Sequence, residues 1–144
     1  MKPGRIITED EEIKAILQSA KTIAVLGLSP KPDRDSHKVA VYLQQNGYRI
    51  FPVRPAQKEI LGEKAFASLN DLEQGVDIVD VFRKPDQILE HAREALGLKP
   101  AVFWMQQGIE NHDAALLLNA GGVDVVMNKC IKVEHERLIK ISAL

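Results

Sequence analysis

The sequence predicts an α/β fold, a mostly parallel, doubly wound sheet of about five strands with helices on both faces. Two observations support this prediction. Runs of strand-forming residues alternate with helical patterns along the chain, and the connections between them are short. In addition, 144 residues of which 45% are hydrophobic suit one compact core. We therefore expect residues 1–144 to form a single domain.

The strands are expected where β-branched and other apolar residues run together. The first run ends at Gly27, and the second contains Pro52 and is followed by Arg54. The third is almost continuously apolar, as expected of a strand that is covered on both faces. The expected strands cover residues 22–26, 48–53, 76–82, 101–105 and 123–127.

The helices are expected where apolar residues recur at helical spacing. An acidic start indicates the first helix, over residues 9–21, and Ser36 is expected to cap the next, which ends at Asn46-Gly47. A third helix over residues 86–96 lies between Pro85 and Gly97. Asn111 is expected to cap a helix containing residues 114–118, which ends at Gly121-Gly122. Residues 56–75 give a weaker pattern, with a short strand at 64–67 and a capped turn at 68–72.

Composition limits the classes of function. The net charge of −1 and the pI near 6.4 give no general basic field, so neither a nucleic-acid nor a membrane partner is expected. No apolar run approaches the roughly 20 residues of a membrane span, and no signal pattern is present, so we expect a soluble, cytoplasmic protein. One cysteine excludes an internal disulfide, and the four scattered histidines lack the spacing of a zinc site, so no metal is expected.

Polar residues follow the strands where their carboxyl ends should share one edge of the sheet. The first loop has a single glycine, Gly27, followed by Ser29, Lys31 and Arg34, so it is not a G-x-G-x-x-G dinucleotide fingerprint. A stiff, basic loop before a helix indicates a phosphate site, although a solvated surface loop is the alternative. Ser36 suits an N-cap and is also compatible with a phosphate contact.

Arg54 follows the second strand, where NAD-binding folds carry an acidic residue that holds the ribose 2′-hydroxyl. An arginine there disfavours NAD and leaves two candidates with a phosphorylated ribose, NADP and coenzyme A. Phe82 suits either the core or a contact. Gln106 and Gly108 suit a ligand contact or a structural turn.

Two further groups suggest chemistry but favour structure. Asp80 lies among valines and needs hydrogen-bond partners or a shifted pKa, and we interpret it as structural. Cys130 and His135 are five residues apart, a spacing that does not bring two side chains onto the same helix face, so a catalytic dyad is not expected.

Five segments together resemble the CoA-binding domain family, the stand-alone relatives of the N-terminal domain of the succinyl-CoA synthetase alpha subunit. The resemblance covers nearly the whole chain. It is carried by residues 25–36 (VLGLSPKPDRDS), 41–53 (VYLQQNGYRIFPV), 76–83 (VDIVDVFR), 104–109 (WMQQGI) and 125–130 (VVMNKC), the last followed by Glu134-His135.

The resemblance implies a Rossmann-like fold with CoA held at the sheet edge. Arg54 departs from relatives that have asparagine there, although a cation could pair with the 3′-phosphate. The phosphohistidine of the synthetase belongs to a second domain that this chain lacks, so the fold does not transfer the reaction. The candidate cofactor-binding residues are Gly27, Leu28, Ser29, Pro30, Lys31, Arg34, Ser36, Val53, Arg54, Phe82, Arg83, Gln106, Gln107, Gly108 and Cys130.

The main hypothesis is a CoA or acyl-CoA binding module, more a binding or regulatory protein than an enzyme, whose protein partner the sequence does not identify. The alternative is an enzyme, either an NADP-dependent reductase or a component of a CoA ligase. A third hypothesis is a regulatory protein in which Cys130, the only thiol, forms a mixed disulfide with CoA.

Overall fold

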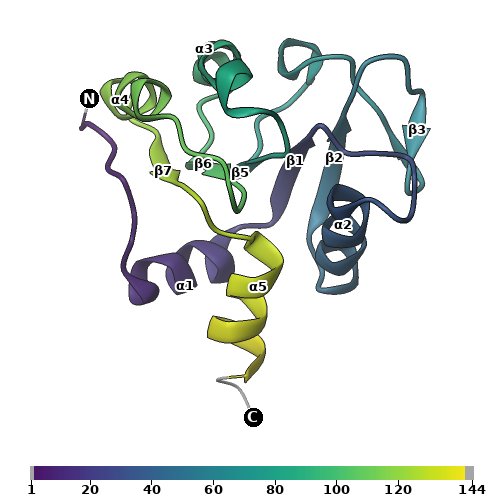
Figure 1. Ribbon diagram of the computed structural model, residues 1–144, viewed down its shortest axis with the longest axis horizontal. Helices are drawn as coiled ribbons and strands as arrows, with labels where there is room; N and C mark the ends of the chain where they lie inside the picture. The colour runs from purple at the N-terminus through teal and green to yellow at the C-terminus, as the bar shows by residue number, and fades with distance from the viewer. Residues whose placement is uncertain (1, 142–144) are drawn as a thin grey trace.

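A computed structural model describes residues 2–141 and confirms the α/β, Rossmann-like fold (Figure 1). The central sheet has five strands, all parallel, in the order β2-β1-β5-β6-β7. Their bounds are Thr22–Leu26 (β1), Arg49–Val53 (β2), Ile78–Val81 (β5), Val102–Met105 (β6) and Asp124–Val126 (β7). Each lies within or at the ends of an expected strand.

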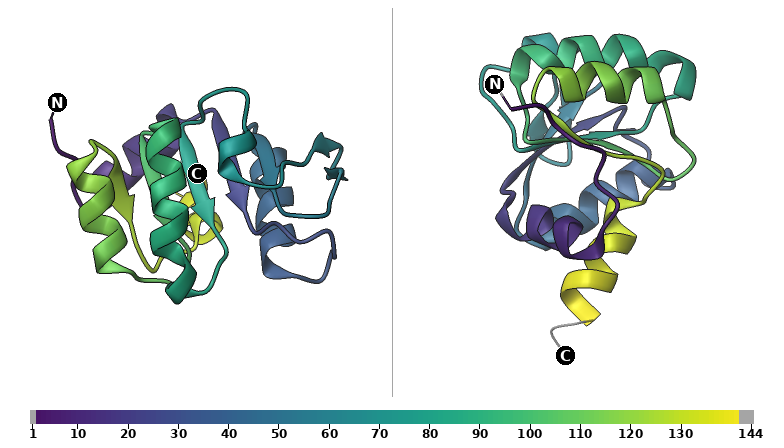
Figure 2. Two further views of the ribbon diagram at one scale, coloured as in Figure 1. Left: turned by 90° about the horizontal axis from the view of Figure 1, so that it is seen from above. Right: turned by 90° about the vertical axis from the view of Figure 1, so that its left-hand side faces the viewer.

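Helices cover both faces of this sheet, as predicted (Figure 2). One layer contains α1, α2 and α5, and the other contains α3 and α4. The helices are Asp10–Ser19 (α1), Asp35–Gln45 (α2), Ile88–Leu98 (α3), His112–Ala120 (α4) and Ile131–His135 (α5), the last continuing as a π-helical segment, Glu136–Lys140. The segment after β7 was not predicted to be helical.

Alternation along the strands divides the core between the two layers. In β1, Ile23 and Val25 pack on the side of α1, α2 and α5, whereas Ala24 and Leu26 pack on the side of α3 and α4. All four are 2% exposed or less, as expected for a strand covered on both faces. The sheet is therefore rigidly held between two apolar layers.

The strand order determines where a ligand can bind. The chain moves from β1 to one side to form β2 and then crosses back to form β5 on the other side of β1. Leu26 is in register with both Val53 and Val81, so three strands end at the same level. In open parallel sheets, ligands bind outside the carboxyl ends at such a switch point. We refer to this end of the sheet as the carboxyl edge, and to the opposite end as the amino edge.

Two predicted helix ends are wrong. Ser36 does not cap α2, because the helix already begins at Asp35, with Arg34 at the N-cap position. The third helix runs through Gly97 to Leu98 and ends with Lys99 in the left-handed conformation, at φ 49°. Asn111 does cap α4, since its Oδ1 accepts a hydrogen bond from the Ala114 N–H at 2.9 Å.

The segment between β2 and β5 contains little regular structure. Glu59–Ile60 (β3) and Glu63–Lys64 (β4) form a small antiparallel pair, and Phe66 bridges to Val53. The strand predicted at 64–67 is therefore wrong in extent. The capped turn is confirmed as a 3-10 turn over Leu69–Asp71 with a capping box.

Residues 4–7 run beside β7, a contact that no sequence pattern indicated. The Ile7 N–H donates to the Val125 carbonyl at 2.7 Å, and the Val125 N–H donates to the Arg5 carbonyl at 2.9 Å. This segment satisfies backbone groups that the edge strand would otherwise expose.

Candidate functional site

Gly27 brings three strand ends together at the carboxyl edge. Its φ is +87°, and a Cβ at this position would lie 2.3 Å from the Phe82 carbonyl oxygen. Its N–H donates to the Val53 carbonyl oxygen at 2.8 Å. Only glycine suits both the backbone conformation and this close approach of β1 to the residue after β5.

The loop after Gly27 is held by two buried hydroxyl groups. Ser36 Oγ accepts a hydrogen bond from the Ser29 N–H at 2.9 Å, and Ser29 Oγ accepts one from the Lys31 N–H at 3.1 Å. The Ser29 carbonyl lies 2.9 Å from His37 Nδ1. Ser36 therefore fixes the loop from inside the helix. The first N–H groups of α2, which have no acceptor within a helix, lie beside this fixed loop.

Cations gather around this loop without partners of opposite charge. A pocket of about 530 Å³, here called the cation pocket, includes Lys31, Arg34 and Arg54 in its wall. Among residues 2–141, none of these three forms an ion pair with a carboxylate. Asp35 is the carboxylate in the wall. The full lining is Gly27, Ser29, Pro30, Lys31, Arg34, Asp35, Ser36, Arg54, Gln57 and Phe82.

Arg83 adds a fourth cation behind Gly27. Its Nε is buried and has no hydrogen-bond partner within the described chain. Burial, together with the nearby charge of Arg54, lowers the pKa of Arg83. Arg54 itself donates from Nη1 to the Gly27 carbonyl at 3.3 Å. Two guanidinium groups close to one another and without a carboxylate favour an anion at this place.

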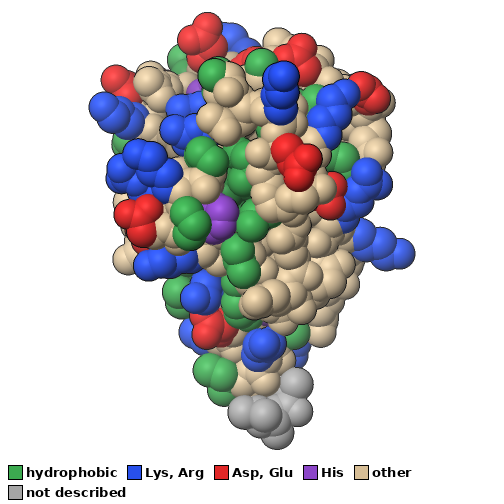
Figure 3. Space-filling view, turned by 90° about the vertical axis from the view of Figure 1, so that its right-hand side faces the viewer, with side chains coloured by type: hydrophobic (Ala, Val, Ile, Leu, Met, Phe, Trp, Pro, Cys, Tyr) green, Lys and Arg blue, Asp and Glu red, His purple; other side chains and the backbone are tan. Residues whose placement is uncertain are grey.

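The positive charge is local. On the side of the molecule with α2 and β2, Lys and Arg side chains are interspersed with Asp and Glu (Figure 3). The surface there has no broad basic face of the kind that binds nucleic acids. The unpaired cations of the carboxyl edge therefore suit a small anion.

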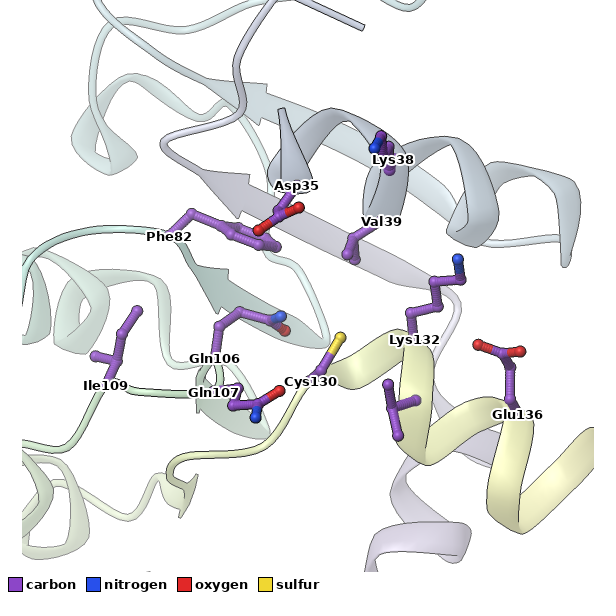
Figure 4. Close-up of a pocket in the computed structure, with 11 residues that line it drawn as sticks. Asp35, Lys38, Val39, Phe82, Gln106, Gln107, Ile109, Cys130, Lys132 and Glu136 are labelled. Carbon is purple, nitrogen blue, oxygen red and sulfur yellow. The ribbon is translucent and has the colours of Figure 1, made fainter. Parts of the chain in front are cut away.

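A second pocket, of about 510 Å³, adjoins the first and is here called the thiol pocket (Figure 4). Phe82 and Asp35 line both pockets and form the boundary between them. The full lining is Asp35, Lys38, Val39, Phe82, Gln106, Gln107, Ile109, Cys130, Lys132, Val133 and Glu136. Phe82 is thus a half-buried pocket residue that also packs against the core.

The end of β6 positions the chain around Cys130. Gln106 Oε1 accepts a hydrogen bond from the Ile131 N–H at 3.0 Å, and the Trp104 indole N–H donates to the Lys129 carbonyl at 2.7 Å. Gln106 is 5% exposed and Trp104 is fully buried. One buried side chain of β6 and one from the residue directly after it therefore hold the residues on either side of Cys130.

The structure brings most of the predicted site residues to these two pockets. Four of them line neither pocket. The side chains of Leu28 and Val53 are fully buried in the core, and the Gly108 N–H donates to Asn128 Oδ1 at 2.7 Å. Arg83 lies against Gly27 but lines neither pocket. Any ligand contact of Leu28 or Val53 would use the backbone.

Several lining residues were missed by sequence reasoning. Asp35, Lys38 and Gln57 lie close in sequence to predicted ones. The residues contributed by α5 and its extension, Lys132, Val133 and Glu136, lie in a segment whose helical character was not predicted. The recurrence of Ile131, His135 and Leu138 at helical spacing was the available signal.

The other titratable candidates do not belong to the site. Asp80 is fully buried, has no hydrogen-bond partner among residues 2–141 and lines neither pocket, and burial raises its pKa well above the usual range. His135 Nδ1 lies 2.7 Å from the Tyr42 hydroxyl rather than bonding to Cys130. Burial and the charge of Lys140 lower the pKa of His135.

Residues 2–141 contain neither a cluster of metal-ligating side chains nor a helix that could span a membrane. No group of three or more His, Cys, Asp or Glu side chains is arranged to hold a metal ion. No helix in that range combines the length and apolar character needed to cross a membrane.

The chain is similar to known proteins over most of its length. The model of a family described as "CoA binding domain" matches residues 21–136. The Bacillus subtilis protein YneT, described as uncharacterized, is 48% identical over 124 residues, which is 86% of this chain and 92% of YneT.

Solved structures show the same fold. A Thermus thermophilus protein has 46% identity and a TM-score of 0.88, with 92% of this chain and all of that chain covered. The dinucleotide-forming acetyl-coenzyme A synthetase 1 of Ca. Korarchaeum cryptofilum has 21% identity and a TM-score of 0.63. The match covers 73% of this chain and 25% of the synthetase, so it shows a likeness of fold to one part of a larger enzyme.

Proposed function

The chain belongs to the CoA-binding domain family, and from this premise we propose that it binds coenzyme A or an acyl-CoA at the carboxyl edge, as a binding or regulatory module. One observation carries the proposal. Lys31, Arg34 and Arg54 surround a pocket without ion-pair partners within the described chain, and this pocket adjoins a second, less basic one.

The two pockets match the two ends of the coenzyme. CoA carries its phosphates at the nucleotide end and a narrow pantetheine arm with two amides and a terminal thiol at the other. We assign the phosphates to the cation pocket, since charge-assisted hydrogen bonds are about twice as strong as neutral ones. The arm then passes Phe82 into the thiol pocket, where Gln106 offers an amide.

The proposal of a module rather than an enzyme is supported by the chemistry of the pockets. Cys130 is the one cysteine of the sequence, and its thiol has no hydrogen bond to a base among residues 2–141. His135 is paired with Tyr42, and Asp80 lies outside both pockets. Turnover of an acyl-CoA by the purified protein would contradict this part of the proposal.

NADP is the competing ligand, because Arg54 and the neighbouring cations suit its 2′-phosphate as well. NADP binding would favour a reductase. The thiol pocket favours CoA, since it has room for the pantetheine arm beside Cys130, and NADP carries no thiol that would use this position.

The test is thermal unfolding with CoA, acetyl-CoA, NADP and NAD side by side. A ligand at 100 times its Kd adds about 2.7 kcal/mol to the free energy of unfolding. We expect stabilisation by CoA and acetyl-CoA and none by NAD. Stabilisation by NADP alone would replace the proposal with the reductase, and no response to any ligand would refute it.

A further inference from the structure

Resting on the proposed CoA binding, we propose that Cys130 forms a reversible mixed disulfide with the thiol of CoA. The site would then respond to the oxidation state of the coenzyme as well as to its presence. Three features of the site support this: the position of the sulfur, the Gln106 Nε2 group beside it, and the order of groups along the two pockets.

The Cys130 sulfur faces the thiol pocket from the start of α5 (Figure 4). The residue is half-buried, so its thiol is shielded yet reachable through the pocket. It also lines a smaller pocket of about 270 Å³ together with Gln107 and Asn128. A disulfide formed here would leave one flank open for a reductant.

Gln106 is a second observation that points to a ligand. Gln106 is only 5% exposed, and its Oε1 accepts a hydrogen bond from the Ile131 N–H. Its Nε2 group has no hydrogen-bond partner among residues 2–141, and the side chain extends into the pocket between Phe82 and Cys130 (Figure 4). This group is available as a donor in the pocket, where an amide carbonyl of a bound pantetheine arm would accept its hydrogen bond.

The order of groups along the site follows the order along CoA. Lys31, Arg34 and Arg54 lie on one side of Phe82, and Gln106 and Cys130 lie on the other. Phosphates, amides and thiol occur in the same sequence along the coenzyme. With the phosphates held at the cations, the arm is directed along Gln106 toward Cys130, which raises the local concentration of its sulfur.

The reaction is a thiol–disulfide exchange that needs no further oxidant. The Cys130 thiolate attacks one sulfur of CoA disulfide, the S–S bond of that disulfide breaks, and a new bond joins Cys130 to one CoA. The other CoA leaves as a thiolate and takes up a proton from water. A second thiol reverses the step in the same way.

The test is the intact mass of the protein after incubation with CoA disulfide, followed in time. We expect one CoA per chain in the wild type, none in Cys130→Ser, and loss of the adduct on addition of dithiothreitol. Pantethine, the same disulfide without phosphates, should react at least about tenfold more slowly, since it lacks the groups that the cations hold.

A relocated thiol provides the matched control. Cys130→Ser combined with Ser19→Cys places the only cysteine on the exposed end of α1. This variant should react with CoA disulfide and pantethine at similar rates. In Lys31→Ala with Arg34→Ala, the wild-type preference for CoA disulfide should disappear.

The possible outcomes separate this inference from the proposed function. No adduct in the wild type, or equal rates with both disulfides, would overturn the role of Cys130. If Cys130→Ser is still stabilised by reduced CoA in that case, CoA binding stands and only the disulfide fails. If neither protein is stabilised by reduced CoA, the proposed function fails first.

Discussion

The amino and carboxyl edges of the central sheet differ in whether the charged side chains described here have partners within the protein. At the amino edge, the Asp77 carboxylate accepts hydrogen bonds from the Lys21 and Thr22 N–H groups at 2.7 and 3.1 Å, and Thr22 Oγ1 accepts one from the Asp77 N–H. At the carboxyl edge, Lys31, Arg34 and Arg54 have no carboxylate partner within the described chain. A carboxylate whose hydrogen bonds are made by the backbone stabilises the fold, whereas the three cations of the cation pocket are available to a ligand.

Two aspartates three residues apart show the same contrast within the protein. Hydrogen bonds from Lys21 and Thr22 lower the pKa of Asp77, despite partial burial. Complete burial without a partner raises the pKa of Asp80 well above its usual range. The environment, rather than the residue type or its neighbours in sequence, therefore determines which carboxyl group is charged.

The largest effect is expected from two glycine substitutions, one at each edge. Gly27→Ala should lower the free energy of unfolding by about 3–5 kcal/mol, because it combines a positive φ with a clash against the Phe82 carbonyl. Gly47→Ala, also at a positive φ of 90° but with nothing within 4 Å of the added Cβ, should cost only about 1–2 kcal/mol.

Chemical denaturation of both variants measures this difference. Equal losses would mean that the approach of Gly27 to the residue after β5 does not constrain the carboxyl edge.

The next effect is on ligand binding. Lys31→Ala with Arg34→Ala should weaken CoA binding at least about 100-fold and leave stability nearly unchanged, since hydrogen bonds to charged groups contribute about 1.5–3 kcal/mol each. The control is Lys21→Ala with Arg49→Ala, which removes the same charge from the amino edge. Calorimetric titration should give the control a wild-type Kd. A similar loss in both variants would show that net charge, rather than the cation pocket, attracts the ligand.

The third prediction concerns Asp80 and pH. Because its folded pKa is raised, the unfolded chain ionises this group above about pH 3.9 while the folded protein keeps it neutral. This costs the folded state about 1.4 kcal/mol for each pH unit up to the folded pKa. Asp80→Asn should therefore gain stability relative to the wild type as pH rises from 4 to 7. Parallel pH profiles for the two proteins would contradict the raised pKa.

The smallest effect is expected at Asp77, with the opposite sign. Its folded pKa is lowered, so its stabilising contribution is complete above about pH 3.9 and is lost as pH falls through the folded value. Asp77→Asn should lose about 1 kcal/mol at pH 7, and the difference from the wild type should shrink in acid. Denaturation at pH 7 and pH 3 checks both points, and a difference that grows in acid would refute the assignment.

The fold could be predicted from sequence because its signals are local. Apolar runs such as that around Val79 and the cap formed by Asn111 were sufficient to locate strands and one helix start. Ser36 was interpreted as a cap because its type suits one, but its hydroxyl bonds to Ser29 seven residues earlier. Such contacts depend on how a loop folds back, and no pattern along the chain encodes them.

The site was predictable where strand ends carry distinctive residues, and less so elsewhere. Lys31, Arg34 and Arg54 could be assigned to one edge because parallel strands share it. The wall formed by Lys132 and Glu136 depends on α5 packing back beside α2, which is a tertiary contact. The separation into two pockets at Phe82 likewise required the structure.

The central claim is that the unpaired cations of the carboxyl edge hold the phosphates of CoA. The most direct measurement is an amide NMR titration of the protein with reduced CoA. We expect the amide signals to shift in the loop from Gly27 to Ser36 and around Arg54, Phe82 and Gln106, and those of Thr22, Gly47 and Asp77 to stay in place. Shifts concentrated at the amino edge, or no shifts at saturating CoA, would contradict it.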